Sequence, residues 1–123
     1  MDEEVNSIKD LIVGLNRELK EEINCDEAVQ ETDYAFSDQI QTANGKSLIL
    51  HFFIKRLTKM AFERVEANAN QAVHYLTESL GIFRVPLKDE KFLDNFLKAS
   101  IFCGNSRDQL TRSIELLTKK NEI

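Results

Sequence analysis

The choice between a helix and a strand rests on residues 47–54, which read Ser-Leu-Ile-Leu-His-Phe-Phe-Ile. Taken alone, this apolar run suits a buried strand. However, no Gly or Pro occurs between it and Gly81, and apolar residues continue beyond it at helical spacing. These residues are Leu57, Ala61, Val65, Ala72, Leu76 and Leu80. The pattern therefore predicts one long central helix over about residues 47–80, with a length of ~51 Å at 1.5 Å per residue.

Shorter helices are predicted on both sides of this segment. The approximate ranges are 3–23, 27–43, 89–103 and 106–120, each with apolar residues three and four apart. Asn44-Gly45 is interpreted as the cap that ends the second of them. The expected fold is all-α: a single domain over residues 1–123, with about five helices packed around the central one.

Composition supports a helical domain without a membrane span. The chain has 123 residues but only four Gly and one Pro, too few for a many-turned β-sandwich. The longest apolar run is far shorter than the ~18 residues of a transmembrane helix. The acidic start, Met1 to Glu4, differs from the basic start of a signal peptide. A cytoplasmic protein with no membrane contact is expected.

Charge is unevenly distributed along the chain. Residues 1–43 carry twelve acids and three bases, whereas the whole chain has a net charge of −5. The acidic segment either complements the basic residues of the predicted central helix or faces a basic partner. A pI near 5.1 counts against non-specific binding to nucleic acid, which depends on positive potential. Nucleic acid is therefore an unlikely partner on this interpretation.

No motif in the sequence predicts catalysis. Gly45-Lys46-Ser47 resembles the end of a P-loop, but Ile40 stands where the first Gly is required. Neither His51 nor His74 follows a Glu at the three-residue spacing of a helical di-iron site. The two cysteines lack a metal-binding or nucleophile signature. We therefore expect no enzyme, no cofactor and no metal, and an enzyme of unknown chemistry is the third alternative.

Apolar residues outside the inward helix faces indicate an interaction surface. The candidate interface residues are Leu48, Phe52, Phe62 and Phe102. They favour a protein partner, a homo-oligomer, or both. The leading interpretation is a small soluble helical-bundle protein that acts by protein–protein interaction, as an adaptor, chaperone-like subunit, regulator or inhibitor.

A local resemblance supplies the second alternative. Residues 99–114 read Ala-Ser-Ile-Phe-Cys-Gly-Asn-Ser-Arg-Asp-Gln-Leu-Thr-Arg-Ser-Ile. This segment resembles the C-terminal helix-turn-helix of Fis-type regulators, although Asn105 departs from the apolar residue usual there. The resemblance implies a DNA-binding transcriptional regulator whose motif spans about residues 91–120 and whose second helix enters the major groove. Its DNA contacts would be Ser106, Arg107, Gln109 and Arg112.

Overall fold

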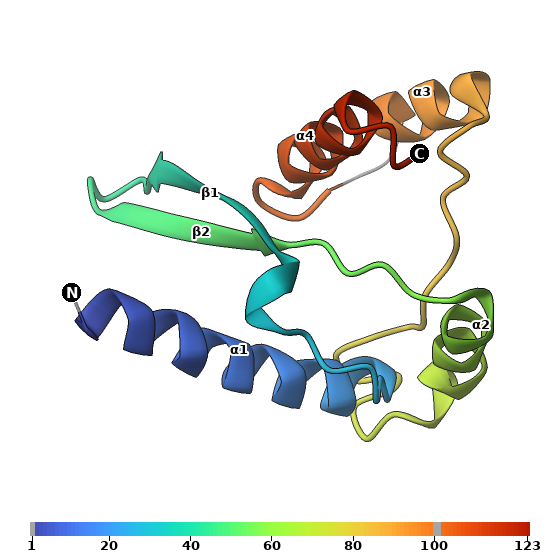
Figure 1. Cartoon of the computed structure of the whole chain (residues 1–123), viewed down its shortest axis with the longest axis horizontal. Helices are drawn as coiled ribbons and strands as arrows, with labels where there is room; N and C mark the ends of the chain where they lie inside the picture. Colours follow the sequence, from blue (N-terminus) through green and yellow to red (C-terminus); the bar gives the residue numbers. More distant parts are fainter. Residues whose placement is uncertain (1, 100–101) are drawn as a thin grey trace. The chain divides into compact units, whose positions relative to one another are not determined.

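The computed structural model describes residues 2–99 and 102–123, with the side chains of the first helix from Ile8 onward. The chain forms two compact units, Met1–Phe83 and Arg84–Ile123. Figure 1 shows their elements. The first unit contains α1 (Asp2–Ile23), η1 (Glu31–Asp33), β1 (Tyr34–Gln41), β2 (Ser47–Phe53), α2 (Lys59–Asn68) and η2 (Ala69–Gln71). The second contains α3 (Glu90–Ala99) and α4 (Ser106–Lys119).

The fold is α+β, so the expected all-α bundle is wrong. β1 and β2 pair antiparallel, with Phe36 opposite Phe52 and Gln41 opposite Ser47. The predicted helix over 27–43 is therefore a short 3-10 turn followed by a strand. The range 47–80 is not one helix. It contains strand β2, then helix α2 directly followed by η2, with irregular segments before α2 and after η2.

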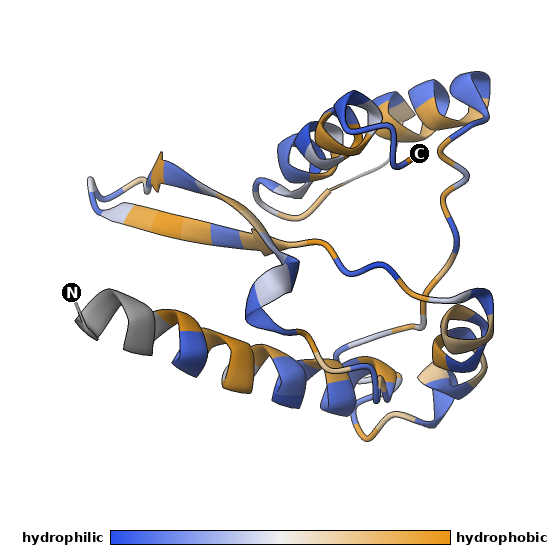
Figure 2. Ribbon diagram, viewed as in Figure 1, coloured by the Kyte–Doolittle hydropathy of each residue, from blue (hydrophilic) through white to orange (hydrophobic). Residues whose placement is uncertain are grey.

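Spacing by four residues explains this error. Four is close to one helical turn but is also a multiple of two, the period of a strand. Phe36 and Ile40 thus share a face in either structure, and so do Leu48 and Phe52. The observed burial of β1 alternates from Phe36 to Gln41, as expected for a strand with one face covered. Figure 2 shows the apolar residues concentrated along β2.

The Asn44-Gly45 pair closes a hairpin and does not cap a helix. Gly45 has a φ of +80°, a conformation that glycine adopts without the steric cost of a Cβ. The Thr42 amide donates to the Lys46 carbonyl at 2.8 Å, and the Gly45 amide donates to the Thr42 carbonyl at 3.0 Å. Asn-Gly between two strands is a strong hairpin signal. The prediction of a helix cap at Asn44-Gly45 is therefore wrong.

Bonds to η1 keep the chain extended just beyond β2. The Ile54 amide donates to the Asp33 carbonyl at 2.8 Å, and Lys55 Nζ lies 3.2 Å from Asp33 Oδ2. Helix α2 begins only after Thr58, whose side chain accepts a hydrogen bond from the Ala61 amide. It ends at Asn68.

Helix α1 is held to the segment that follows it. The Asn16 amide group donates to the Val29 carbonyl at 3.1 Å and accepts from the Val29 amide at 2.7 Å. Val29 is buried, as are Ala69 and Ala72 where η2 lies near α1. The range 3–23, for which a helix is predicted, lies within α1.

The second unit consists of two helices near the predicted ranges 89–103 and 106–120. Asp89 Oδ1 accepts from the Phe92 amide at 3.0 Å at the start of α3. The Phe102 ring meets Phe96 edge-to-face at 5.5 Å between centroids. Residues 100–101 lie outside the described residues. Within the described parts of both units, no helix has the length and hydropathy needed to cross a membrane.

Candidate metal centre

Three carboxylates crowd the C-terminal end of α1. Glu18 and Glu22 are one turn apart and therefore share a face of the helix, with Glu21 beside them. The C-terminus is the negative end of the helix dipole, where cations rather than anions are favourable. This arrangement is electrostatically costly for the isolated protein.

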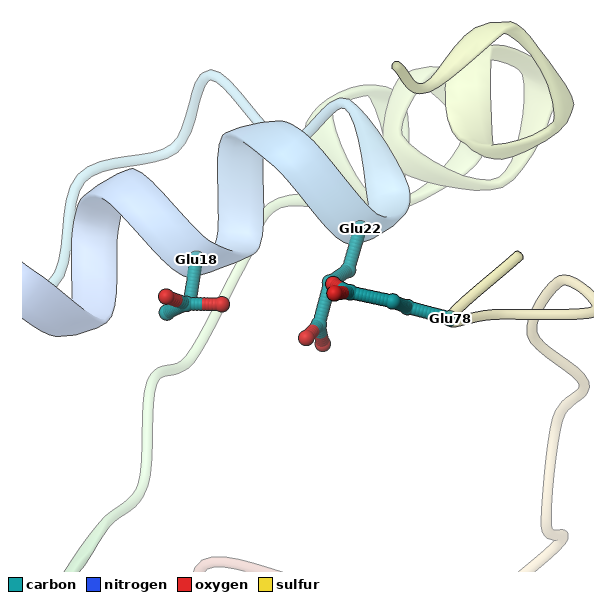
Figure 3. Close-up of side chains that lie close together, drawn as sticks. All are labelled: Glu18, Glu22 and Glu78. Atoms are coloured by element: carbon teal, nitrogen blue, oxygen red, sulfur yellow. The ribbon is translucent and has the colours of Figure 1, made fainter. Parts of the chain in front are cut away.

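A distant loop, residues 72–79, adds a fourth carboxylate. Figure 3 shows Glu78 extending from this loop toward Glu22, with Glu18 on the same side of α1. One oxygen from each of Glu18, Glu22 and Glu78 lies within 4.8 Å of the other two. Glu18 and Glu22 are half-buried, whereas Glu78 is exposed. We call these three residues the carboxylate cluster.

Two hydrogen bonds fasten the loop to the last turn of α1. The His74 amide donates to the Glu21 carbonyl at 2.8 Å, and the Ser79 hydroxyl donates to the Glu22 carbonyl at 2.7 Å. The last carbonyl groups of a helix have no partner within the helix. The loop therefore caps the same helical turn that carries the carboxylates.

Three basic side chains lie near the cluster or its neighbouring acids. Nδ1 of His74 lies 2.9 Å from Glu78 Oε2 and 3.8 Å from Glu21 Oε2. This Nδ1 atom is buried and has no hydrogen-bond partner within the described part of the chain. Arg17 contacts Glu18 at 3.3 Å, while Lys20 is paired with Asp26 at 2.6 Å.

The surroundings of Glu22 disfavour its charged form. Partial burial raises the pKa of its carboxyl above the ordinary value, and the negative charges of Glu18 and Glu78 raise it further. The neighbouring His74 opposes this rise. A bound cation would offset the repulsion that favours the protonated form.

The donor set of the cluster fits a hard divalent cation. Mg²⁺, Mn²⁺ and Ca²⁺ prefer oxygen ligands, and carboxylates are their usual protein donors. Two donors come from one helix face and one from a loop bonded to that helix. The cluster could therefore hold such an ion, with water or a substrate phosphate completing its coordination.

The candidate interface residues come from both units. Leu48 and Phe52 lie on the same face of β2, where Leu48 is exposed and Phe52 stacks on Phe36 at 5.1 Å. Phe62 is exposed on α2. Phe102 belongs to the second unit, where the Arg107 guanidinium lies 5.0 Å from its ring centroid.

The residues assigned to DNA contact lie along α4. The Ser106 hydroxyl donates to the Cys103 carbonyl at 2.6 Å at the start of this helix. Arg107 and Arg112 are exposed, and Gln109 is half-buried. The Gln109 carbonyl accepts from the Ser113 hydroxyl at 2.7 Å.

Sequence reasoning missed all four carboxylates around this centre. The sequence contains a physical signal for three of them. Glu18, Glu21 and Glu22 lie within the last two turns of a predicted helix, where negative charge is unfavourable because of the helix dipole. Glu78 carried no such signal. His74 is half-buried, and its Nδ1 lies 3.8 Å from Glu21 Oε2.

Comparison with known proteins shows similarity over most of the chain. A family model described as "Nudt16-like: U8 snoRNA-decapping enzyme-like" matches residues 3–119. The U8 snoRNA-decapping enzyme of Mus musculus is 40% identical over 111 residues, covering 83% of this chain and 54% of that protein. The protein of the same name from Xenopus laevis is 38% identical over 113 residues, covering 85% of this chain and 52% of its own length. The chain thus spans about half the length of the curated relatives it matches.

These matches correct the functional interpretation. The expectation of a non-catalytic interaction protein is wrong, because the matched relatives are named as enzymes. The description as a regulatory helical bundle is also wrong, because the fold is α+β and the matched family is named for an enzyme. The DNA-binding alternative rested on residues 99–114 alone, whereas the family match covers residues 3–119.

Proposed function

This chain belongs to the Nudt16-like, U8 snoRNA-decapping enzyme-like family, and on that premise we propose that it carries the metal-binding part of a Nudix-type hydrolase. The observation that supports the proposal is the convergence of Glu18, Glu22 and Glu78 within 4.8 Å. Hydrolysis of phosphate esters and anhydrides commonly uses divalent cations held by carboxylates.

The four carboxylates of the centre have two roles in this proposal. Glu18, Glu22 and Glu78 would hold the cation, which would supply Lewis-acid activation of a phosphate and of water. Glu21 lies next to the cluster, 3.8 Å from His74. It is the candidate to accept a proton from the attacking water, because it stands beside the cluster without belonging to it.

The proposed substrate is an RNA with a 5′ cap. The relatives are named for decapping of U8 snoRNA, and removal of a cap requires cleavage of its phosphoanhydride linkage. This proposal departs from the expectation that nucleic acid is an unlikely partner, which rested on net charge. A negatively charged protein can bind phosphates where a divalent cation supplies the local positive charge.

An assay with cap-labelled RNA tests the proposal. The chain is incubated with RNA labelled in the cap, with and without Mg²⁺ or Mn²⁺, and the released nucleotide is measured. We expect cation-dependent release, and Glu22→Gln should lower the rate by about 100-fold or more, the order expected when a metal ligand is lost.

Glu27→Gln is the matched control, because Glu27 is a nearby acid outside the carboxylate cluster. It should retain the activity of the unaltered chain. Cation-independent release, or full activity in Glu22→Gln, would contradict the proposed metal centre.

Cytoplasmic location and a protein or homo-oligomeric partner stay predictions.

A further inference from the structure

The loop that carries Glu78 contains a tight turn closed by its own backbone hydrogen bonds. Within it, the Glu78 amide donates to the His74 carbonyl at 2.9 Å, and the Leu76 amide donates to the Ser79 carbonyl at 2.6 Å. Leu76 has a φ of +74°, a left-handed conformation that is uncommon for a non-glycine residue. A tight, strained turn thus separates His74 from Ser79.

Both ends of this turn are bonded to α1. His74 caps the Glu21 carbonyl through its backbone amide, whereas Ser79 caps the Glu22 carbonyl through its side chain. Only the second bond can be removed by substitution without altering the backbone. Because Glu78 adjoins Ser79, this hydroxyl bond holds the residue next to Glu78 against the last turn of α1.

We infer that Ser79 is a positioning residue, which holds Glu78 in the carboxylate cluster by bonding to the last turn of α1. The inference rests on the proposed function. Without the Ser79 bond, the negative charges of Glu18, Glu22 and Glu78 push the exposed end of the loop away from the helix. The cation would then lose a preformed third donor, as happens when an outer-shell partner of a metal ligand is removed.

Titration of the full chain with Mn²⁺ alone tests this inference. Electron paramagnetic resonance measures the concentration of free Mn²⁺ and hence the affinity. Ser79→Ala should weaken Mn²⁺ binding by about tenfold, in the range seen for outer-shell substitutions. Ser79→Thr keeps a hydroxyl and should restore the affinity to within about threefold. The metal-free thermal melt of each variant reports whether it is folded.

Thr77→Ala is the matched control within the same loop. The Thr77 hydroxyl donates to the His74 carbonyl at 3.1 Å, so its bond stays inside the loop and does not reach α1. This variant should bind Mn²⁺ as the unaltered chain does. An equal loss in Thr77→Ala and Ser79→Ala would overturn the inference, because any disturbance of the loop would then suffice.

A double-mutant cycle shows whether Ser79 acts through Glu78. In the Glu78→Gln background, Ser79→Ala should change Mn²⁺ affinity less than twofold, because the carboxylate it positions is already absent. A full tenfold loss in that background would overturn the inference, and so would an unchanged affinity in the single variant. If the unaltered chain fails to bind millimolar Mn²⁺, the proposed metal centre itself is wrong.

Discussion

Helices α1 and α4 end in similar backbone geometry but opposite charge. An asparagine in the left-handed region follows each helix: Asn24 has a φ of +54° and Asn121 a φ of +57°. Helix α4 ends in lysine, which complements the helix dipole, and the following bonds are local, such as Glu122 amide to Leu117 carbonyl at 2.9 Å. Helix α1 also has a local bond, Cys25 amide to Leu19 carbonyl at 3.2 Å, but its last turn carries Glu21 and Glu22, whose carbonyls accept bonds from residues more than 50 positions away.

The contrast distinguishes a stable helix end from a functional one. At α4 the sequence supplies favourable charge and needs nothing from elsewhere. At α1 it accumulates anions in an unfavourable field and recruits a distant loop that brings another anion. Such local conflict is expected where binding, rather than stability, determines the residues.

The largest expected difference is the response to a divalent cation. At 100 times its Kd, Mn²⁺ should stabilise the unaltered chain against urea by about 2.7 kcal/mol, as linkage requires for a ligand of the folded state. Glu22→Gln should lose most of this gain, whereas Lys119→Gln at the end of α4 should keep it. Equal stabilisation of all three proteins would place the cation elsewhere.

Replacement of the two asparagines should be unequal. Asn121→Ala should cost up to about 1–2 kcal/mol, because alanine lacks the short polar side chain that makes the left-handed conformation tolerable for asparagine. Asn24→Ala should cost about 1 kcal/mol more, since its side chain also donates to the Asn68 carbonyl at 3.2 Å. Urea unfolding measures both values.

Asn24→Gly separates the two contributions, because glycine removes the backbone penalty but not the lost side-chain bond. It should be more stable than Asn24→Ala and less stable than the unaltered chain. Full recovery in Asn24→Gly would show that the bond to Asn68 contributes nothing.

The pH dependence of stability should reveal the repulsion at α1. Since the pKa of Glu22 is raised in the folded chain, folding favours its protonated form, and this contribution to stability is lost as pH rises through the folded-state pKa. Without metal, Glu22→Gln should therefore melt at a higher temperature than the unaltered chain near pH 7. The difference should shrink as pH falls below the ordinary glutamate pKa, and a constant difference would contradict the shift.

Single charge removals should have small effects of opposite sign at the two ends. Lys119→Gln should destabilise α4 by about 0.3–1 kcal/mol, and Glu21→Gln should stabilise the metal-free chain by a similar amount. Chemical denaturation at low ionic strength gives the clearest values, because salt screens these interactions. The same sign for both substitutions would exclude the dipole explanation.

Sequence periodicity predicted the helices where residues three and four apart alternate. The stripe of Ile8, Ile12, Leu15 and Leu19 does so, and helical geometry alone accounts for it. The strands were missed because Phe36 and Ile40 are separated by four, a spacing that both periods satisfy. The Asn44-Gly45 pair could have resolved the ambiguity in favour of a hairpin.

The sequence contains a local signal for the helical part of the candidate centre but none for Glu78. Glu18, Glu21 and Glu22 are neighbours along one helix, so their proximity and their conflict with the dipole follow from local geometry alone. Glu78 lies far along the chain in a segment that was predicted to be helical. Its approach depends on the turn at Leu76 and on the bonds from His74 and Ser79, which no local pattern encodes.

The sequence by itself therefore determined helix α1 and the run of acids at its end, because both depend on residues within one or two turns. Only the tertiary structure decided that residues 47–53 pair with β1 and that Glu78 meets Glu18 and Glu22. Strand pairing and loop docking join residues distant along the chain. Their stability comes from bonds and burial that exist only once those residues have met.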